Sequence, residues 1–128
     1  MINREKRFAI KISRELNKRG FLVEQHNSKS SRSIYLKIDR GSIPTIRISD
    51  HKRLIDDNCK YNIIRKYNGP KEEYINGRRK KYYTFKNINK VIMDIEFERN
   101  RKILSIGYIR YTNKLKNKIE YNKRRAIA

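Results

Sequence analysis

The chain has 128 residues, of which 37% are hydrophobic; this share supports one compact core and excludes disorder throughout. Lysine and arginine total 34 against 13 aspartate and glutamate, a formal net charge of +21. Such an excess of cations is typical of proteins that bind a polyanion, above all nucleic acid, with an acidic protein partner as the alternative. No stretch approaches the ~20 apolar residues of a membrane-spanning helix, so no membrane partner is expected.

Cysteine usage and the N-terminal segment indicate the compartment. Cys59 is the single cysteine, so an internal disulfide and a cysteine-based zinc site are excluded, and the first residues lack the apolar core of a secretory signal. We expect a cytoplasmic protein of a bacterial host cell, folded as one basic domain over residues 1–120 with a frayed tail at 121–128. The two histidines and scattered acids show no metal-ligand spacing, and no glycine-rich phosphate loop is present, so no metal or cofactor is expected.

The first predicted elements are a helix and a strand. Residues 2–19 carry apolar side chains at helical spacing and cations on the other faces, and Gly20 supplies a stop. A strand is predicted from Phe21, followed by a polar turn. The helical spacing is carried by Phe8 or Ala9, Ile12 and Leu16.

A β-hairpin is predicted next, because residues 32–39 and 43–49 alternate apolar and polar side chains around a turn at 40–42. Its apolar side would pack on the first helix in an α-β-β-β arrangement. The side chains expected in the core are Ile34, Leu36, Ile38, Ile46 and Ile48. The opposite, polar face carries Ser33, Tyr35, Lys37, Thr45, Arg47 and Ser49, with Asp50 and His51 at the strand exit.

The second half predicts another hairpin and a helix. Residues 58–70 give a weak signal for a strand or a short helical turn, and residues 72–85 predict a hairpin with Asn76-Gly77 at its turn. A helix follows from Asn87, a candidate cap, with Ile88, Val91, Ile92 and Ile95 on its core side. Residues 101–115 fit a helix or a strand, and helix is favoured although Gly107 weakens it. The fold class is therefore α+β: a basic N-terminal helix on a small antiparallel sheet, a second hairpin, and a C-terminal helix or helices.

Three basic clusters are candidates for binding phosphate. Dense positive charge displaces counterions from a nucleic acid, and neighbouring tyrosines add rings on which bases stack. For any one cluster alone a solvated face is the better interpretation, whereas the three together, with so few acids, favour binding. The candidate residues are Arg4, Arg7, Lys11 and Arg14 in the first helix; Arg78, Arg79, Lys80, Lys81, Tyr82 and Tyr83 in the second hairpin; and Arg110 and Lys114 near the C-terminus.

The polar face of the first hairpin is a candidate site of a different kind. Cross-strand pairing would place Tyr35 beside Arg47, with Ser33 and Ser49 next to them. RNA cleavage by 2′-OH attack needs a base, a cation and a positioned phosphate, which His51, Arg47 and Tyr35 would supply. The alternatives are a binding surface without catalysis, or a structural Tyr35–Arg47 pair beside a capping Asp50.

The order helix, "RGF", strand, "SRSIY" resembles toxins of bacterial toxin–antitoxin pairs, which have an α-β-β-β-α fold like that of double-stranded-RNA-binding domains. In that family a Gly-Ser-His precedes the aromatic strand residue, and its histidine cleaves mRNA. Here Ser31, Arg32 and Ser33 stand in that region without a histidine, so cleavage of this type would require His51 as a substitute. The resemblance implies a metal-independent ribonuclease.

A second resemblance runs from about Gly20 to Ile95. The Gly-Phe pair after a basic helix, the stretch "IRISDH" and the late helix "INKVIMDIE" are similar to short phage-encoded proteins, among them broad-spectrum type II-A anti-CRISPR inhibitors. Those carry a closely similar Ile-Arg-Leu-Ser-Asn-His stretch, so Asp50 stands where they have asparagine. The resemblance implies an inhibitor that engages a CRISPR effector nuclease or its guide RNA. A basic DNA-binding accessory protein fits the charge alone.

Overall fold

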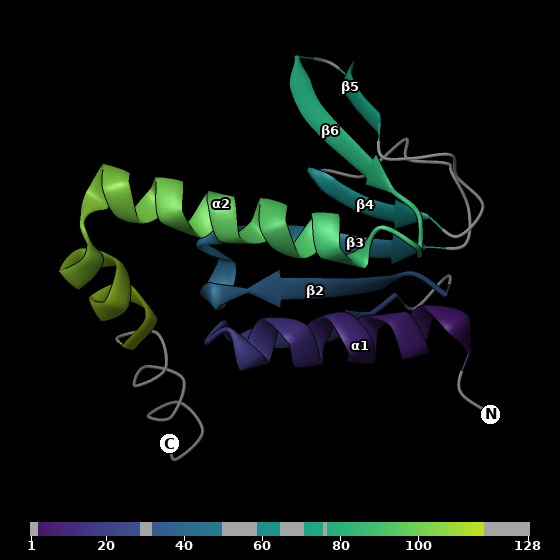
Figure 1. Cartoon of the computed structure of the whole chain (residues 1–128), viewed down its shortest axis with the longest axis horizontal. Helices are drawn as coiled ribbons and strands as arrows, with labels where there is room; N and C mark the ends of the chain where they lie inside the picture. Colours follow the sequence, from purple (N-terminus) through teal and green to yellow (C-terminus); the bar gives the residue numbers. More distant parts are fainter. Residues whose placement is uncertain (1–2, 29–31, 50–58, 65–70, 76, 117–128) are drawn as a thin grey trace.

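Two helices cover one face of a six-stranded sheet (Figure 1). The computed structural model describes residues 3–28, 32–49, 59–64, 71–75 and 77–116. Helix α1 (Arg4–Lys18) and helix α2 (Ile88–Ile106) are long enough to span the sheet, and both contribute side chains to a single core. The predicted α+β class is confirmed.

Helix α1 begins and ends as its sequence predicts. The Asn3 side chain caps the first turn by accepting a hydrogen bond from the Lys6 backbone N–H at 2.8 Å, which satisfies one of the free donors at a helix start. Its apolar residues are buried against the sheet, and its cations lie outside. Gly20 follows the last turn at φ +83°, a conformation that glycine adopts without a steric penalty.

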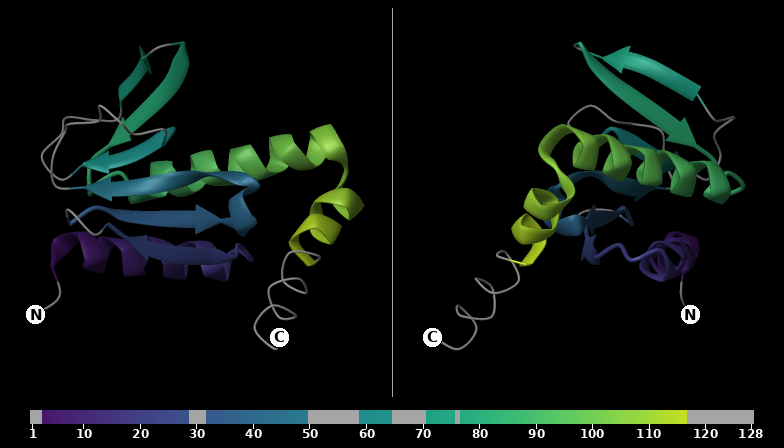
Figure 2. Two further views of the ribbon diagram at one scale, coloured as in Figure 1. Left: turned by 180° about the vertical axis from the view of Figure 1, so that it is seen from behind. Right: turned by 60° about the vertical axis from the view of Figure 1, so that its left-hand side comes forward.

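The sheet is mixed, and its strand order is β1-β2-β3-β4-β6-β5. Strands β1–β3 form an antiparallel meander, β5 and β6 form an antiparallel hairpin, and β4 lies between these groups, parallel to both neighbours (Figure 2). The strands are β1 (Val23–Asn27), β2 (Ile34–Ile38), β3 (Ile43–Ser49), β4 (Tyr61–Ile64), β5 (Lys71–Ile75) and β6 (Arg78–Tyr83).

The predicted small antiparallel sheet was therefore incomplete. Both predicted hairpins are present, but the second one extends the same sheet as the first. The reason is β4, a four-residue strand in which Tyr61, Asn62 and Ile63 are all buried. A central strand covered on both faces shows no alternation, so its sequence carries only a weak strand signal.

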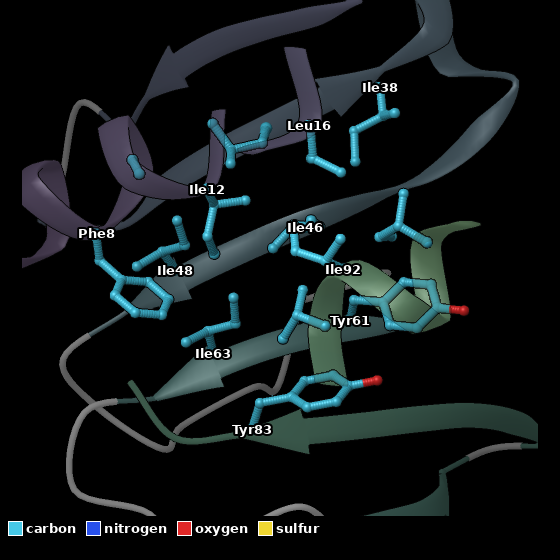
Figure 3. Close-up of a cluster of buried hydrophobic side chains, with 14 of the residues drawn as sticks. Phe8, Ile12, Leu16, Ile38, Ile46, Ile48, Tyr61, Ile63, Tyr83 and Ile92 are labelled. Atoms are coloured by element: carbon cyan, nitrogen blue, oxygen red, sulfur yellow. The ribbon is translucent and has the colours of Figure 1, made fainter. Parts of the chain in front are cut away.

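An isoleucine-rich core fills the space between the helices and the sheet (Figure 3). The five hairpin residues predicted for the core are all buried, and they contact the apolar side of α1. Full burial of an aliphatic side chain of this size stabilises the fold by about 1.5–3 kcal/mol relative to exposure. The core is completed across the sheet by Tyr61, Ile63 and Tyr83, and from α2 by Val91, Ile92 and Ile95.

The C-terminal part is helical, as predicted, with a break at Gly107. Helix α2 ends at Ile106, Gly107 has φ +90°, and residues 108–116 are again helical. The predicted capping role of Asn87 is wrong in its detail. Asn87 occupies the cap position of α2, but its side chain accepts hydrogen bonds from the backbone N–H and hydroxyl of Thr84 at 2.9 and 3.1 Å. It closes the turn that precedes α2 instead.

A buried carboxylate joins distant parts of the chain. Asp39, in the turn between β2 and β3, has a left-handed backbone (φ 48°) and no exposed surface. Its side chain accepts hydrogen bonds from the Leu22 N–H at 3.0 Å, from Arg99 Nε at 2.9 Å and from the hydroxyl of Tyr111. The contacts fix the helix at 108–116 against the meander, because Arg99 and Tyr111 lie on either side of the break.

Candidate nucleic-acid interface

Five cations form one line along the outer side of α1. Their spacing of 3, 4, 3 and 4 residues keeps them on one helix face, opposite the buried apolar face, over about 21 Å at the α-helical rise. We call this line the basic ridge. It consists of Arg4, Arg7, Lys11, Arg14 and Lys18, all of them exposed.

The basic ridge is largely uncompensated. Among the residues that the structure describes, no carboxylate forms an ion pair with its first four members. Lys18 pairs with Glu15 at 3.3 Å, and Glu5 lies on the buried side of the helix. Phosphate affinity depends on cations that have no internal partner to displace, so the ridge is the best-placed phosphate contact among the predicted clusters.

The second hairpin is far less available than its sequence predicts. Tyr82 and Tyr83 are only 2% and 1% exposed, so the predicted stacking of bases on these two rings is wrong in this conformation. Lys80 is buried as well, and Arg79 is ion-paired with Glu72 across the β5–β6 pair. Adjacent strand residues face opposite sides of a sheet, and β6 is covered on both sides, which buries both tyrosines.

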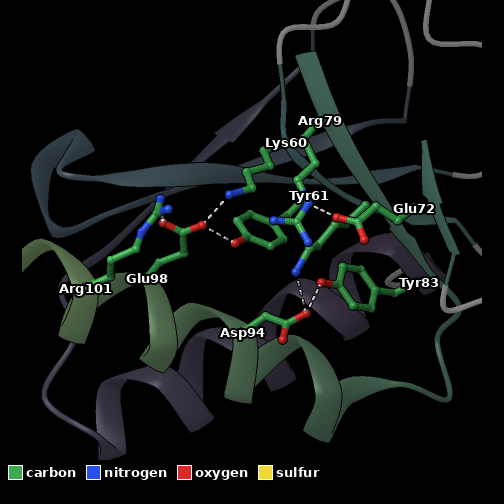
Figure 4. A network of polar contacts seen from close by, with 9 residues as sticks. Lys60, Tyr61, Glu72, Arg79, Tyr83, Asp94, Glu98 and Arg101 are labelled. Atoms are coloured by element: carbon green, nitrogen blue, oxygen red, sulfur yellow. Dashed lines mark hydrogen bonds and ion pairs between the residues drawn. The ribbon is translucent and has the colours of Figure 1, made fainter. Parts of the chain in front are cut away.

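Two buried tyrosines, Tyr61 and Tyr83, belong to a network of polar contacts between the sheet and α2 (Figure 4). Glu98 accepts hydrogen bonds from Lys60 Nζ at 2.5 Å and from the Tyr61 hydroxyl at 2.6 Å. One turn earlier on α2, Asp94 accepts from the hydroxyl of Tyr83 and lies 3.2 Å from Lys90 Nζ. Since the two carboxylates are four residues apart, they face β4 and β6 together.

The pKa shifts of Tyr61, Tyr83 and Glu98 indicate that this network has a structural role. Burial, together with the hydrogen bond to a carboxylate, raises the pKa of Tyr61 and of Tyr83 above the ordinary tyrosine range. Burial also raises the pKa of Glu98, but the hydrogen bonds from Lys60 and Tyr61 outweigh it, and the net pKa is lowered. Neutral tyrosines therefore donate hydrogen bonds to Asp94 and Glu98, an arrangement that fixes α2 on the sheet.

Lys81 borders this network and is a weakened phosphate contact. Burial lowers its pKa, while Asp94 acts in the opposite direction. Its Nζ lies 3.7 Å from the Asp94 carboxylate and 6.0 Å from the centre of the Tyr61 ring. The lysine is therefore directed toward the sheet–helix interface, and a nucleic acid would compete with Asp94 for it.

The polar face of the first hairpin has the predicted register. Tyr35 pairs with Arg47, and the hydroxyls of Ser33 and Ser49 lie 3.2 Å apart. The register extends this row to His26, which pairs with Tyr35 between β1 and β2. The sequence could have indicated this neighbour, because His26 lies in the strand predicted from Phe21, and that strand pairs antiparallel with β2.

This face does not form an open binding surface. Arg47 is only 4% exposed, and both serines are buried as well. Tyr35 is half-buried, and Lys37 is exposed. Asp50 and His51 lie outside the described residues, so the predicted catalytic set of His51, Arg47 and Tyr35 stays a prediction.

The remaining predicted cations lie on the C-terminal helix. Arg110 and Lys114 are four residues apart and exposed, and Lys116 adds a third exposed cation. They face solvent at the end of the fold remote from the start of α1 (Figure 1). The basic ridge and this group are therefore both accessible. In the second hairpin, Arg78 and Arg79 are exposed, Lys81 is half-buried and Lys80 is buried.

Within the described residues, no group of three or more histidine, cysteine, aspartate or glutamate side chains is placed to hold a metal ion. The helices in that part of the chain are all too short or too polar to cross a membrane. The chain matches no family model, no curated protein and no solved structure.

Proposed function

We propose that the protein binds nucleic acid, RNA in the first place, through the basic ridge of α1, and that it acts as a phage or mobile-element inhibitor of an RNA-loaded CRISPR effector. The observation that carries the first part is the line of four exposed cations, Arg4, Arg7, Lys11 and Arg14, without a carboxylate partner among the described residues. A formal net charge of +21 increases the attraction over longer distances.

The ridge would contact the phosphate backbone of the nucleic acid and not its bases. Five flexible cations at a mean spacing of 3.5 residues suit a line of phosphates, and contacts of this type are tolerant of sequence. Four tyrosines whose rings could stack on bases are buried instead: Tyr61, Tyr82, Tyr83 and Tyr111. We therefore expect strong salt dependence and little sequence preference.

The effector part of the proposal rests on the resemblance of "IRISDH" and its surroundings to type II-A anti-CRISPR proteins. An RNA-loaded effector in the host cytoplasm presents guide-RNA phosphates and a positively charged channel, and a basic inhibitor would reach the former. The structural feature in favour is that Ile46 and Ile48 are core residues of β3, so the described part of this stretch, residues 46–49, belongs to the sheet.

The test has two arms. Affinity for a labelled single-stranded RNA, a duplex RNA and a duplex DNA is measured by fluorescence anisotropy between low and moderate salt. Co-purification with a tagged type II-A effector is then compared with and without its guide RNA. RNA binding that weakens steeply with salt, and capture that depends on the guide, support the proposal. Absence of binding to all three nucleic acids in dilute buffer contradicts it.

The ribonuclease alternative is favoured by one observation, the register that pairs Tyr35 with Arg47. It predicts RNA cleavage in EDTA that His51→Ala abolishes. Intact RNA with the wild-type protein, under conditions in which anisotropy shows that the RNA is bound, would leave the binding function alone.

A further inference from the structure

The outer face of α2 carries large apolar side chains that the core does not use. Met93, Phe97 and Leu104 are 63%, 67% and 86% exposed, although the protein as a whole is strongly polar. Their spacing of four and seven residues, with Asn100 between the last two, matches the a and d positions of a heptad. We call these three residues the apolar seam.

The seam lies on the side of α2 opposite the core. Val91, Ile92 and Ile95 face the sheet, half a helical turn away. Single exposed apolar residues are normal on protein surfaces, whereas three in line on one helix are characteristic of a binding face. The contrast with α1 strengthens the point, because the outer face of that helix is basic.

The apolar surface continues beyond the break at Gly107. Tyr108 and Ile109 are both exposed, and together with Ile106 they line an open hollow at the bend. Figure 1 shows that α2 runs past the ends of β2 and β3 before the chain turns. A partner helix could therefore lie along α2 without meeting the sheet.

Cations border the apolar surface. Lys90 and Arg101 lie along one side of the seam, with about half or more of each side chain exposed, while their ion pairs with Asp94 and Glu98 are made on the side toward the sheet. Glu96, on the other side of the seam, is paired with Arg19. Arg110 and Lys114 line the hollow beyond Gly107. A second copy of the chain would bring another formal net charge of +21 to this face and would be repelled. A nucleic acid would meet the cations but would offer no apolar surface to the seam.

We propose that the outer face of α2 is a docking site for an acidic amphipathic helix of a partner protein. Apolar residues of that helix pack on the seam, and its flanking aspartate and glutamate side chains meet Lys90, Arg101 and the cations beyond Gly107. The site is separate from the basic ridge, so the inference does not rest on RNA binding.

The probe is a labelled acidic peptide of about three heptads, with leucine and isoleucine at a and d and glutamate at the flanking positions. Its affinity is measured by anisotropy and compared with that of a scrambled peptide of the same composition. The scrambled peptide controls for attraction to the overall positive charge. We expect it to bind about tenfold or more weakly, because it cannot present a continuous apolar stripe.

The protein variants locate the site. Phe97→Ala with Leu104→Ala should weaken the acidic peptide by about tenfold or more while RNA affinity stays unchanged. Asn89→Ala with Ser105→Ala, exposed polar positions on the same helix, is the matched control and should bind as wild type. All four side chains are exposed, so unchanged thermal unfolding is expected. Equal binding of both peptides, or an affinity that the Phe97/Leu104 variant does not reduce, would overturn the proposal. Self-association that this variant abolishes would overturn it in favour of a second copy.

Discussion

Removing two charges from the middle of the basic ridge should change the salt dependence of RNA binding by a calculable amount. The variant is Arg7→Gln with Lys11→Gln. Both side chains are exposed and have no ion-pair partner among the described residues, and glutamine has a similar helix propensity. The helix should therefore stay intact, and the change should affect only the phosphate contacts.

The magnitude follows from the number of uncompensated cations. Each phosphate contact contributes about 0.7 to 0.9 to the slope of log K against log salt, so four contacts cost roughly 50- to 150-fold in affinity between 50 and 200 mM salt. With two contacts left, the same change in salt should cost only about 7- to 12-fold. Anisotropy titrations of one labelled RNA at four or more salt concentrations give both slopes directly.

The matched control removes the same charge from the second hairpin, by Arg78→Gln with Arg79→Gln. Arg79 is already paired with Glu72, so we expect a smaller change in slope there. An unaltered slope in the ridge variant would refute the assignment of the interface to α1. Equal slopes in both variants, each lower than wild type, would show that binding depends on net charge and not on the ridge.

Three further predictions concern the buried polar groups. Asp39→Ala leaves Arg99 unpaired and should lower the free energy of unfolding by about 3–5 kcal/mol, measured by urea denaturation. The lowered pKa of Glu98 contributes stability that is present above its ordinary pKa and is lost as pH falls through its folded-state pKa. Glu98→Gln should therefore reduce the loss of stability on acidification, and an unchanged acid-unfolding profile would contradict this. The raised pKa of Tyr61 and of Tyr83 should keep both hydroxyls neutral above pH ~10 for as long as the protein is folded. The folded state should lose stability as pH rises through this range, because both tyrosines ionise more readily in the unfolded chain. Ultraviolet titration of phenolate would contradict this if all nine tyrosines ionised together near that pH.

The local elements were predictable because each has its own periodicity. Residues of α1 repeat at helical spacing, the first hairpin alternates, and the second hairpin has an Asn-Gly turn. The predicted pairing of Tyr35 with Arg47 is present, although a register shift separates it from the Ile38–Ile43 pair next to the turn. Strand order was not predictable in this way, since it depends on where β4 is inserted, and a short strand buried on both faces has no alternation to reveal it.

The candidate site was predicted only in part, for a reason of burial. A run of four cations and two tyrosines in a hairpin predicts an exposed binding surface, but β6 lies inside the sheet and Asp94 of α2 accepts a hydrogen bond from Tyr83. Carboxylates on other elements, Glu72 for Arg79 and Asp94 for Lys81, decide whether such cations are available, and no local pattern contains that information. The apolar seam was not predicted either, because only Ile88, Val91, Ile92 and Ile95 of this helix were assigned to a face.

The two helices give one side of the molecule two different chemistries. Helices α1 and α2 are joined at their solvent side by the ion pair between Arg19 and Glu96 at 2.8 Å, and both rest on the same core. Their outer faces differ completely, since one presents the basic ridge and the other the apolar seam. A phosphate chain and a protein helix require different contacts, so neither ligand can replace the other at its site. An inhibitor built in this way would hold an RNA and a protein surface at once, which suits a target that is itself a protein loaded with RNA. The rigid core beneath both helices would then fix the relative position of the two ligands, and the specificity that the ridge lacks would come from the seam.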